Sequence, residues 1–174
     1  GKVEFVFSNK KTTAEMYDSI THFNFEKSIA KQNATGAGNL FVHSSIFEKV
    51  GMFEEVKSGG DFRWTRMAVS KGFVLTYCNE AVVQHPTRKL DELLKNRLRT
   101  GLGTVGYLRQ RCISKLHIAM LTARKLLPRR PFYINKAIET AGSNDMNGKL
   151  VSIFLVAWLS NIVSILAILV SMLP

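Results

Sequence analysis

The feature that most constrains this chain is an uninterrupted apolar segment. Residues 150–173 read LVSIFLVAWLSNIVSILAILVSML and carry no charge. At about 1.5 Å per residue, a helix of this length can cross the roughly 30 Å hydrocarbon core of a bilayer. The sequence therefore predicts one transmembrane helix over residues 149–174. The alternative is a buried helix of a soluble core, although such helices are rarely apolar on every face.

Most of the positive charge precedes this segment. The formal net charge is +11, and the stretch from Arg88 to Arg130 holds twelve Lys and Arg residues against two acids, Asp91 and Glu92. A stretch of this kind needs an anionic partner, which could be a membrane surface, a polyphosphate or a nucleic acid. The positive-inside tendency places the residues before the apolar helix in the cytoplasm, at an inner or plasma membrane.

The basic stretch contains an amphipathic pattern. Apolar residues recur every three or four positions from Val105 to Leu127, with Lys and Arg between them. We expect a basic interfacial helix over residues 104–131, at the headgroup level of an anionic leaflet, and a linker over residues 132–148. A preceding helix, residues 90–98, is expected to break at three glycines, Gly101, Gly103 and Gly106.

Residues 1–103 alternate strand and helix patterns. Strands are expected at residues 3–7, 40–42, 73–77 and 81–85. Helices are expected between them, the first from a Thr12–Glu15 capping box to Lys31, the second from a Ser45–Glu48 capping box to Gly51, and the third from an Asp61 N-cap to Gly72. The pattern predicts an α/β fold, with a mixed sheet and flanking helices.

Polar groups at strand ends and loop tips are the functional candidates in this part. Asp61 follows two glycines, Gly59 and Gly60, which let a substrate approach the backbone closely. His85 ends a strand, and residues 36–39, Gly-Ala-Gly-Asn, leave room for a ligand. The other histidines have no comparable context. Two cysteines, Cys78 and Cys112, lack a metal-type spacing, so neither a disulfide scaffold nor a zinc site is expected.

Four of these runs, in this order and spacing, resemble the C-terminal half of family 2 glycosyltransferases, which have a GT-A type fold. They are TGAGNLFV at 35–42, FEKVGMF at 47–53, GGDFRW at 59–64 and AVVQHP at 81–86. The resemblance covers about residues 1–103 and implies a partial GT-A-like sheet. It implies an inverting transfer of a sugar from a nucleotide-sugar donor to a hydroxyl acceptor, with Asp61 as the catalytic base.

The same resemblance implies roles for other residues. A Mg²⁺ or Mn²⁺ ion would stabilise the departing diphosphate, with His85 as its candidate ligand in this chain, and Arg88 could approach the phosphates. Trp64 could shape the acceptor site. The remaining donor-site and acceptor-site candidates are Gly38, Asn39, Gly59 and Gly60.

One departure from the family is large. Its N-terminal half, which binds the nucleotide and carries a metal-binding Asp-x-Asp motif, has no counterpart here, and no Asp-x-Asp occurs. We therefore expect these residues to be the acceptor-binding half of a longer or split enzyme together with its membrane anchor, inactive in isolation. The expected acceptor is lipid-linked or part of the cell envelope, as in polysaccharide or glycolipid synthesis.

Two other classes of protein stay open. A non-catalytic, membrane-anchored adaptor would use the same basic helix and apolar segment. A basic nucleic-acid-binding module is less favoured, because Tyr107 is the only aromatic residue between Arg88 and Arg130 and no recognised nucleic-acid motif is present. No nucleic acid is expected as a partner beyond the nucleotide of the donor.

Overall fold

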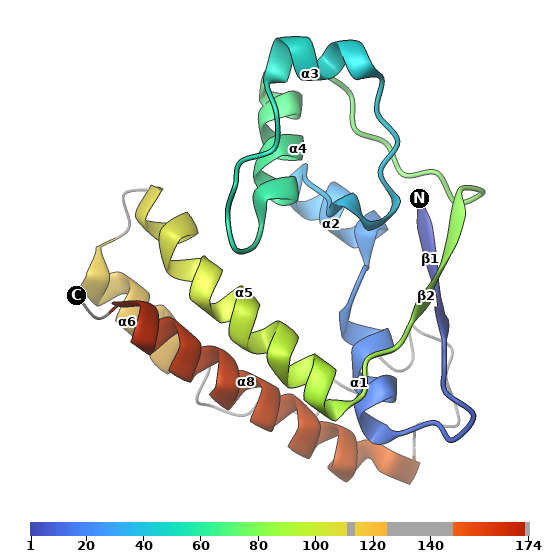
Figure 1. Cartoon of the computed structure of the whole chain (residues 1–174), viewed down its shortest axis with the longest axis vertical. Helices are drawn as coiled ribbons and strands as arrows, with labels where there is room; N and C mark the ends of the chain where they lie inside the picture. Colours follow the sequence, from blue (N-terminus) through green and yellow to red (C-terminus); the bar gives the residue numbers. More distant parts are fainter. Residues whose placement is uncertain (111–113, 125–147, 173–174) are drawn as a thin grey trace. The chain divides into compact units, whose positions relative to one another are not determined.

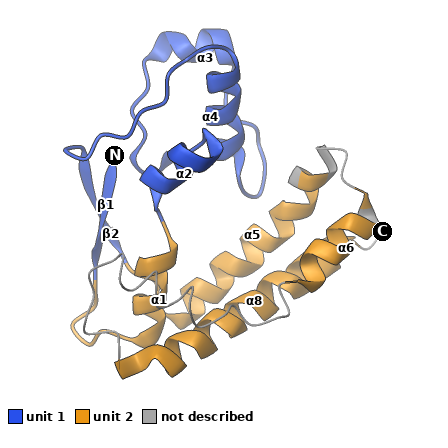
Figure 2. Ribbon diagram, turned by 180° about the vertical axis from the view of Figure 1, so that it is seen from behind, with its two compact units in different colours: residues 1–6, 23–86 blue, residues 7–22, 87–174 orange. Residues whose placement is uncertain are grey.

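The computed structural model describes residues 1–110, 114–124 and 148–172. The chain divides into two compact units, shown in Figure 2. Unit 1 comprises residues 1–6 and 23–86, and unit 2 comprises residues 7–22 and 87–174. The chain therefore passes from one unit to the other three times, and each unit is described on its own.

Unit 1 contains a two-stranded parallel sheet (Figure 1). Strand β1 (Lys2–Val6) pairs with β2 (Val82–Pro86), and Phe5 lies opposite His85 in the register. Both strands were predicted, within one residue of these bounds. Parallel pairing of chain segments this far apart needs a long connection, which residues 7–81 provide with helices from both units.

The two other predicted strands are wrong as regular strands. Residues 40–42 follow a short 3-10 helix, η1 (Ala37–Asn39), and neither they nor residues 73–77 belong to a sheet in the described structure. Their composition favours strands, but a strand also needs a partner for its backbone groups, and the described residues supply none.

Three α-helices complete unit 1: α2 (Phe25–Gln32), α3 (Ser44–Val50) and α4 (Gly60–Ser70). The predicted Ser45–Glu48 capping box is wrong, because the side chain of His43 caps α3 by accepting from the N–H of Ser45. Gly51 does end this helix, at φ +92°, as its lack of a Cβ permits. The core of the unit is formed by Val50, Trp64 and Ala68.

The single helix expected up to Lys31 is two helices. The predicted Thr12–Glu15 capping box is confirmed and begins α1 (Thr13–Thr21), which belongs to unit 2. Phe23 then adopts φ +50°, which interrupts the helix, and the side chain of Asn24 caps α2. The strand and helix spacings carried no signal of this break.

Unit 2 is helical. Its longest elements, α5 (Leu90–Gln110) and α8 (Leu150–Met172), lie side by side in Figure 1, with α1 against both and α6 (Lys115–Ala123) near their ends. One core cluster joins α1, Leu93 of α5 and the first turns of α8, and a second joins Val105, Ile118 and Ile168.

The expected break at three glycines is wrong, and the expected helix over residues 104–131 is not one continuous helix. Helix α5 continues through Gly101, Gly103 and Gly106, and a new helix, capped by Ser114, begins at Lys115. A Cβ at Gly101 would lie 2.6 Å from the Cβ of Ala167, so this glycine permits close packing on α8. The predicted helix end at 128–131 and residues 132–147 of the predicted linker lie outside the described residues.

Helix α8 confirms that the apolar segment is helical. Its 23 residues are long and apolar enough to cross a membrane, by length and composition alone. One side packs on unit 2 through Ile153, Ala157 and Ile168, and large apolar side chains such as Leu155 and Leu166 are exposed on the other. Whether α8 spans a bilayer stays a prediction.

Replacing Gly101 by Ala is expected to destabilise unit 2 by about 1–3 kcal/mol, because the new methyl group overlaps Ala167 and the backbone of Ser164. Gly106→Ala is the matched control in the same helix, since nothing lies within 4 Å of its added Cβ. The control should gain stability from helix propensity. Thermal unfolding of the detergent-solubilised chain, followed by circular dichroism, measures both. Equal shifts in the two variants would contradict the packing described.

Candidate functional site

Asp61 lies in the first turn of α4 and not at the N-cap, where it was predicted. The N-cap is Gly59, which adopts φ +81°, a left-handed conformation that favours glycine. At Gly60 an added Cβ would lie 3.0 Å from the carbonyl oxygen of Glu54, so the backbone is closely approached there. The two glycines thus shape the turn that presents the half-buried carboxylate of Asp61.

The carboxylate of Asp61 is bound to the glycine loop. Its Oδ2 accepts a 2.9 Å hydrogen bond from the N–H of Ala37, and its Oδ1 accepts one of 2.9 Å from the N–H of Phe62. Gly36 is close as well, because a Cβ there would lie 3.2 Å from Oδ2. An ionised carboxylate has about four acceptor positions, so these two bonds leave room for a further hydroxyl donor.

A buried threonine holds the same loop from the other side. The hydroxyl of Thr65 accepts from the N–H of Thr35 at 3.0 Å and lies 3.1 Å from the carbonyl oxygen of Thr35. It also lies 2.9 Å from the carbonyl oxygen of Asp61, one helical turn earlier. Thr65 was not predicted as a site residue, although its position four residues after Asp61 places it on the same face of the helix.

Asn39, a predicted ligand residue, is buried and ties chain segments together. Its Nδ2 donates to the carbonyl oxygens of Lys2, in β1, and Ala81, which precedes β2, at 2.8 and 2.7 Å. The amide nitrogen is thus committed to the fold. Its Oδ1 is buried and has no hydrogen-bond partner among the described residues, so a contact with a ligand would have to come from that atom.

His85 belongs to an aromatic cluster in unit 1. Its ring lies 4.7 Å from the ring of Phe23 and 6.3 Å from that of Phe5, centre to centre. Phe23 also contacts Phe25 at 5.4 Å, and a Cβ at Gly38 would lie 3.2 Å from Phe23. The cluster therefore joins the sheet to the glycine loop that binds Asp61. Phe23 and Phe25 were not predicted as site residues.

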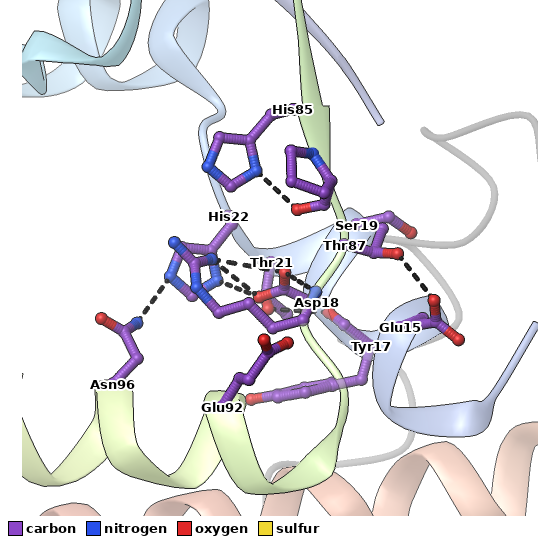
Figure 3. A network of polar contacts seen from close by, with 12 residues as sticks. Glu15, Tyr17, Asp18, Ser19, Thr21, His22, His85, Thr87, Glu92 and Asn96 are labelled. Carbon is purple, nitrogen blue, oxygen red and sulfur yellow. Dashed lines mark hydrogen bonds and ion pairs between the residues drawn. The ribbon is translucent and has the colours of Figure 1, made fainter. Parts of the chain in front are cut away.

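One nitrogen of His85 is engaged by the backbone. Nδ1 lies 2.7 Å from the carbonyl oxygen of Pro86, which can only accept, so Nδ1 carries the proton (Figure 3). In the neutral ring Nε2 then has a free lone pair, as a metal ligand or proton acceptor needs. The described residues contain no cluster of three His, Cys, Asp or Glu side chains, so a metal at His85 would need ligands from elsewhere.

Trp64 lies in the core of unit 1. Trp64 is 3% exposed, and its indole donates from Nε1 to the carbonyl oxygen of Gly51 at 2.6 Å. The indole packs against Phe47 and Phe53 at ring distances of 4.7 and 5.0 Å, and these two rings also contact each other. Contact between Trp64 and an acceptor stays a prediction, which this burial disfavours. The tryptophan instead fixes α4, and with it the turn that carries Asp61.

Arg88 belongs to unit 2, whereas Asp61 and His85 belong to unit 1. Its backbone N–H donates to Oδ2 of the fully buried Asp18 at 3.0 Å, and its guanidinium lies 3.3 Å from both carboxylate oxygens. His22 also contacts Asp18, with Nδ1 2.7 Å from Oδ1. Arg88 thus has a structural role in the network of Figure 3, and its contact with phosphate stays a prediction.

The second carboxylate of this network is Glu15, which is 1% exposed. It accepts from the backbone N–H groups of Ser8 and Thr12 at 2.9 and 2.8 Å, and from the hydroxyl of Thr87 at 3.1 Å. Ser8 and Thr87 follow β1 and β2 closely in sequence. Together with the Asp18–Arg88 contacts, Glu15 fixes the segments that follow both strands to helix α1.

Burial and hydrogen bonding act in opposite directions on these groups. Burial raises the pKa of Glu15, but the N–H groups of Ser8 and Thr12 and their hydroxyls outweigh it and lower this pKa to about 2. Burial likewise opposes the charge of Asp18, yet the contacts with His22 and Arg88 lower its pKa. Burial lowers the pKa of His22, against the attraction of Asp18.

The low pKa of Glu15 predicts acid-dependent stability. Its ordinary value is 4.5, so its contribution is complete above that pH and is lost as the pH falls toward 2. When the pH falls from 5 to 2.5, the wild type should therefore lose about 2 kcal/mol more free energy of unfolding than Glu15→Gln. Urea titrations across this range measure the slope. A variant that loses stability as steeply as the wild type would contradict the assignment.

The comparison with curated proteins found a glycosyltransferase. The chain is 36% identical over 162 residues to glycosyltransferase AglE of Haloferax volcanii. The match covers 91% of this chain and 53% of AglE, so the chain spans about half the length of this relative. No protein-family model matches the chain, and no solved structure matches it.

Proposed function

We propose that this chain is the acceptor-binding part of an inverting glycosyltransferase. The observation that carries the proposal is the half-buried carboxylate of Asp61, which is held by two backbone N–H groups against a glycine loop and keeps free acceptor positions. The similarity to AglE over 91% of the chain supports glycosyl transfer as the reaction class. We also propose that the enzyme is a family 2 glycosyltransferase with a GT-A type fold.

The proposed reaction is a single displacement at the anomeric carbon. An acceptor hydroxyl attacks this carbon, a new glycosidic C–O bond forms, and the bond to the nucleoside diphosphate breaks with its electron pair leaving on the phosphate oxygen. The proton of the hydroxyl passes to a carboxylate oxygen of Asp61. A positioned base of this type contributes about 10²–10⁴-fold to a rate.

The donor would be a nucleotide sugar whose nucleotide is bound mainly outside this chain. His85, with its Nε2 lone pair, would contribute to a Mg²⁺ or Mn²⁺ site, and Gly38 and Gly59 would leave space for the substrates. Such an ion would stabilise the negative charge of the departing diphosphate. Arg88 could approach the phosphates only by giving up part of its contact with Asp18.

Helix α8 and the basic residues before it suggest where the reaction takes place. An apolar helix of 23 residues would hold the protein at a membrane, and Lys and Arg side chains would attract anionic lipid headgroups by about 1 kcal/mol each. We propose a single span with the catalytic region in the cytoplasm, and a lipid-linked acceptor in the synthesis of a glycolipid or cell-envelope polysaccharide.

Transfer of radiolabelled sugar tests the proposal. Membranes from cells that produce the chain together with the remaining half of AglE would be incubated with a panel of nucleotide sugars and a lipid extract. Label should enter the organic phase with one donor and should be absent from membranes lacking the chain. If no donor gives product although both polypeptides are folded, the non-catalytic membrane adaptor is the better interpretation.

A further inference from the structure

Thr65 is a buried polar residue that the proposed reaction does not use. It is 2% exposed, and its hydroxyl lies within hydrogen-bond distance of four backbone groups. Two of these contacts are ordinary for a threonine in a helix, since the carbonyl oxygens of Asp61 and Phe62, at 2.9 and 3.3 Å, belong to the preceding turn of α4. The other two reach Thr35, which lies 30 positions earlier in the sequence. The hydroxyl therefore joins α4 to the start of the glycine loop.

The N–H of Thr35 depends on this hydroxyl. Thr35 is 4% exposed, and its N–H donates to Oγ1 of Thr65 at 3.0 Å. A hydroxyl has one proton and two acceptor positions, so it can accept from this N–H while it donates to one nearby carbonyl oxygen. Valine has nearly the same shape but no acceptor, and it would leave the N–H of Thr35 buried without its partner. Thr and Ser can make this contact at position 65, and Val cannot.

Two tethers thus connect α4 to residues 35–37. The second is the 2.9 Å bond from the N–H of Ala37 to Oδ2 of Asp61. Ala37 is exposed, so water competes for both groups and the net strength of this bond is small. The bond at Thr65 is buried, where a low local dielectric strengthens it. The buried tether therefore does more to hold the loop where Ala37 can bind the carboxylate.

The chain between the two tethers is short. Only Gly36 separates Thr35 from Ala37, and an added Cβ there would lie 3.1 Å from the ring of Phe25 and 3.2 Å from Oδ2 of Asp61. Thr65 follows Asp61 by one helical turn, so both tethers start from the same face of α4. A shift of the backbone at residue 35 must therefore move the N–H that the carboxylate accepts.

We infer that Thr65 is a positioning residue, whose hydroxyl fixes the carboxylate of Asp61 through residues 35–37. Its effect on sugar transfer rests on the proposed function, whereas the tether itself does not. Misplacement of a reacting group by about 1 Å can cost about 10²-fold in rate. Loss of the hydroxyl should therefore lower kcat and leave KM nearly unchanged.

Hydrogen exchange in the full chain tests the tether independently of the reaction. In Thr65→Val, the amides of Thr35 and Ala37 should exchange at least tenfold faster than in the wild type, and in Thr65→Ser they should exchange at about the wild-type rate. Thr100→Val is the matched control, because the hydroxyl of Thr100 contacts two carbonyl oxygens of its own preceding turn, at 2.9 and 3.2 Å, and belongs to unit 2. This control should leave both amides unchanged.

Sugar transfer tests the role of the tether, with the chain co-expressed with the part of AglE outside the matched region. For Thr65→Val, kcat should fall about 10–100-fold and KM should change less than about twofold. Thr65→Ser should restore most of the rate, and Thr100→Val should transfer sugar like the wild type. Combined with Asp61→Asn, Thr65→Val should cause no further loss, because its effect passes through the carboxylate. A purely structural role would lower the rate in both backgrounds.

Near-ultraviolet circular dichroism confirms that each variant is folded. If Thr65→Val does not fold, Thr65→Cys replaces it with the same expectations, since a thiol is only a weak acceptor. Three results would overturn the inference: unchanged exchange of both amides, an unchanged rate where Asp61→Asn is impaired, or a further loss in the double variant. Wild-type transfer by Asp61→Asn would instead reject the proposed base, and hydrogen exchange alone would then decide whether Thr65 holds the loop.

Discussion

Sugar transfer by the complete enzyme is expected to fall about 10²–10⁴-fold when Asp61 is replaced by Asn, with little change in KM. The amide is nearly isosteric and can still accept from Ala37 N–H, so the glycine loop stays docked, but it cannot take a proton from the acceptor. Initial rates of labelled-sugar transfer at saturating donor measure the effect.

Two controls separate loss of the base from loss of structure. Glu48→Gln removes an exposed acid of the same unit and should transfer sugar at the wild-type rate. Asp61→Asn should unfold at the same temperature as the wild type within a few degrees. Undiminished transfer by folded Asp61→Asn would remove the carboxylate from the mechanism and favour the adaptor interpretation.

The largest loss of stability is expected from Glu15→Ala. The substitution removes the carboxylate that accepts from the N–H groups of half-buried Ser8 and exposed Thr12 and from the hydroxyl of buried Thr87. A buried group left unsatisfied costs about 1–3 kcal/mol, and water can replace part of the lost bonding at Thr12 and Ser8, so the free energy of unfolding should fall by about 2–4 kcal/mol. Equilibrium urea unfolding of the solubilised chain measures this change.

The matched control for this variant is Asp91→Ala. Asp91 lies in the same unit but is exposed, and its ion pair with Lys95 at 3.5 Å is of the solvent-screened type. Its removal should cost less than about 1 kcal/mol. If Glu15→Ala were as mild as this control, the network of Figure 3 would not be what fixes α1 to the segments that follow the strands.

Local signals in the sequence predicted local structure well. Spacing and residue type predicted the Thr12–Glu15 capping box, strands β1 and β2, and the helical apolar segment. The glycine pair before Asp61 was expected to let a substrate approach the backbone, which stays a prediction; in the structure Gly59 adopts a left-handed conformation. In each case the deciding interactions join residues close in sequence, or depend on hydrophobic patterning alone.

Contacts between distant segments could not be predicted in this way. Glu15 reads as a capping residue, but the 3.1 Å bond from Thr87, 72 positions away, makes it part of a network. Arg88 was predicted to approach phosphate, yet it binds Asp18, which lies 70 positions earlier in the sequence. A single sequence contains no pairing information of this range, and charge alone does not identify a partner.

The strand-like residues 40–43 and 73–77 show a different limit. Their composition and alternation indicate strands, but strand formation depends on a second segment as well. Gly101 shows the converse, because a residue that usually interrupts helices here allows α5 and α8 to approach. In both cases tertiary packing decides the conformation and overrides the local preference of the sequence.

The dependence of the rate on acceptor acidity tests most directly whether Asp61 removes the acceptor proton. Transfer to a series of acceptors with progressively lower hydroxyl pKa would be measured for the wild type and for Asp61→Asn. A more acidic hydroxyl needs less help from a base, so the ratio of wild-type to variant rates should shrink steadily along the series. A ratio that stays constant from the weakest to the strongest acid would contradict the proposed role of Asp61.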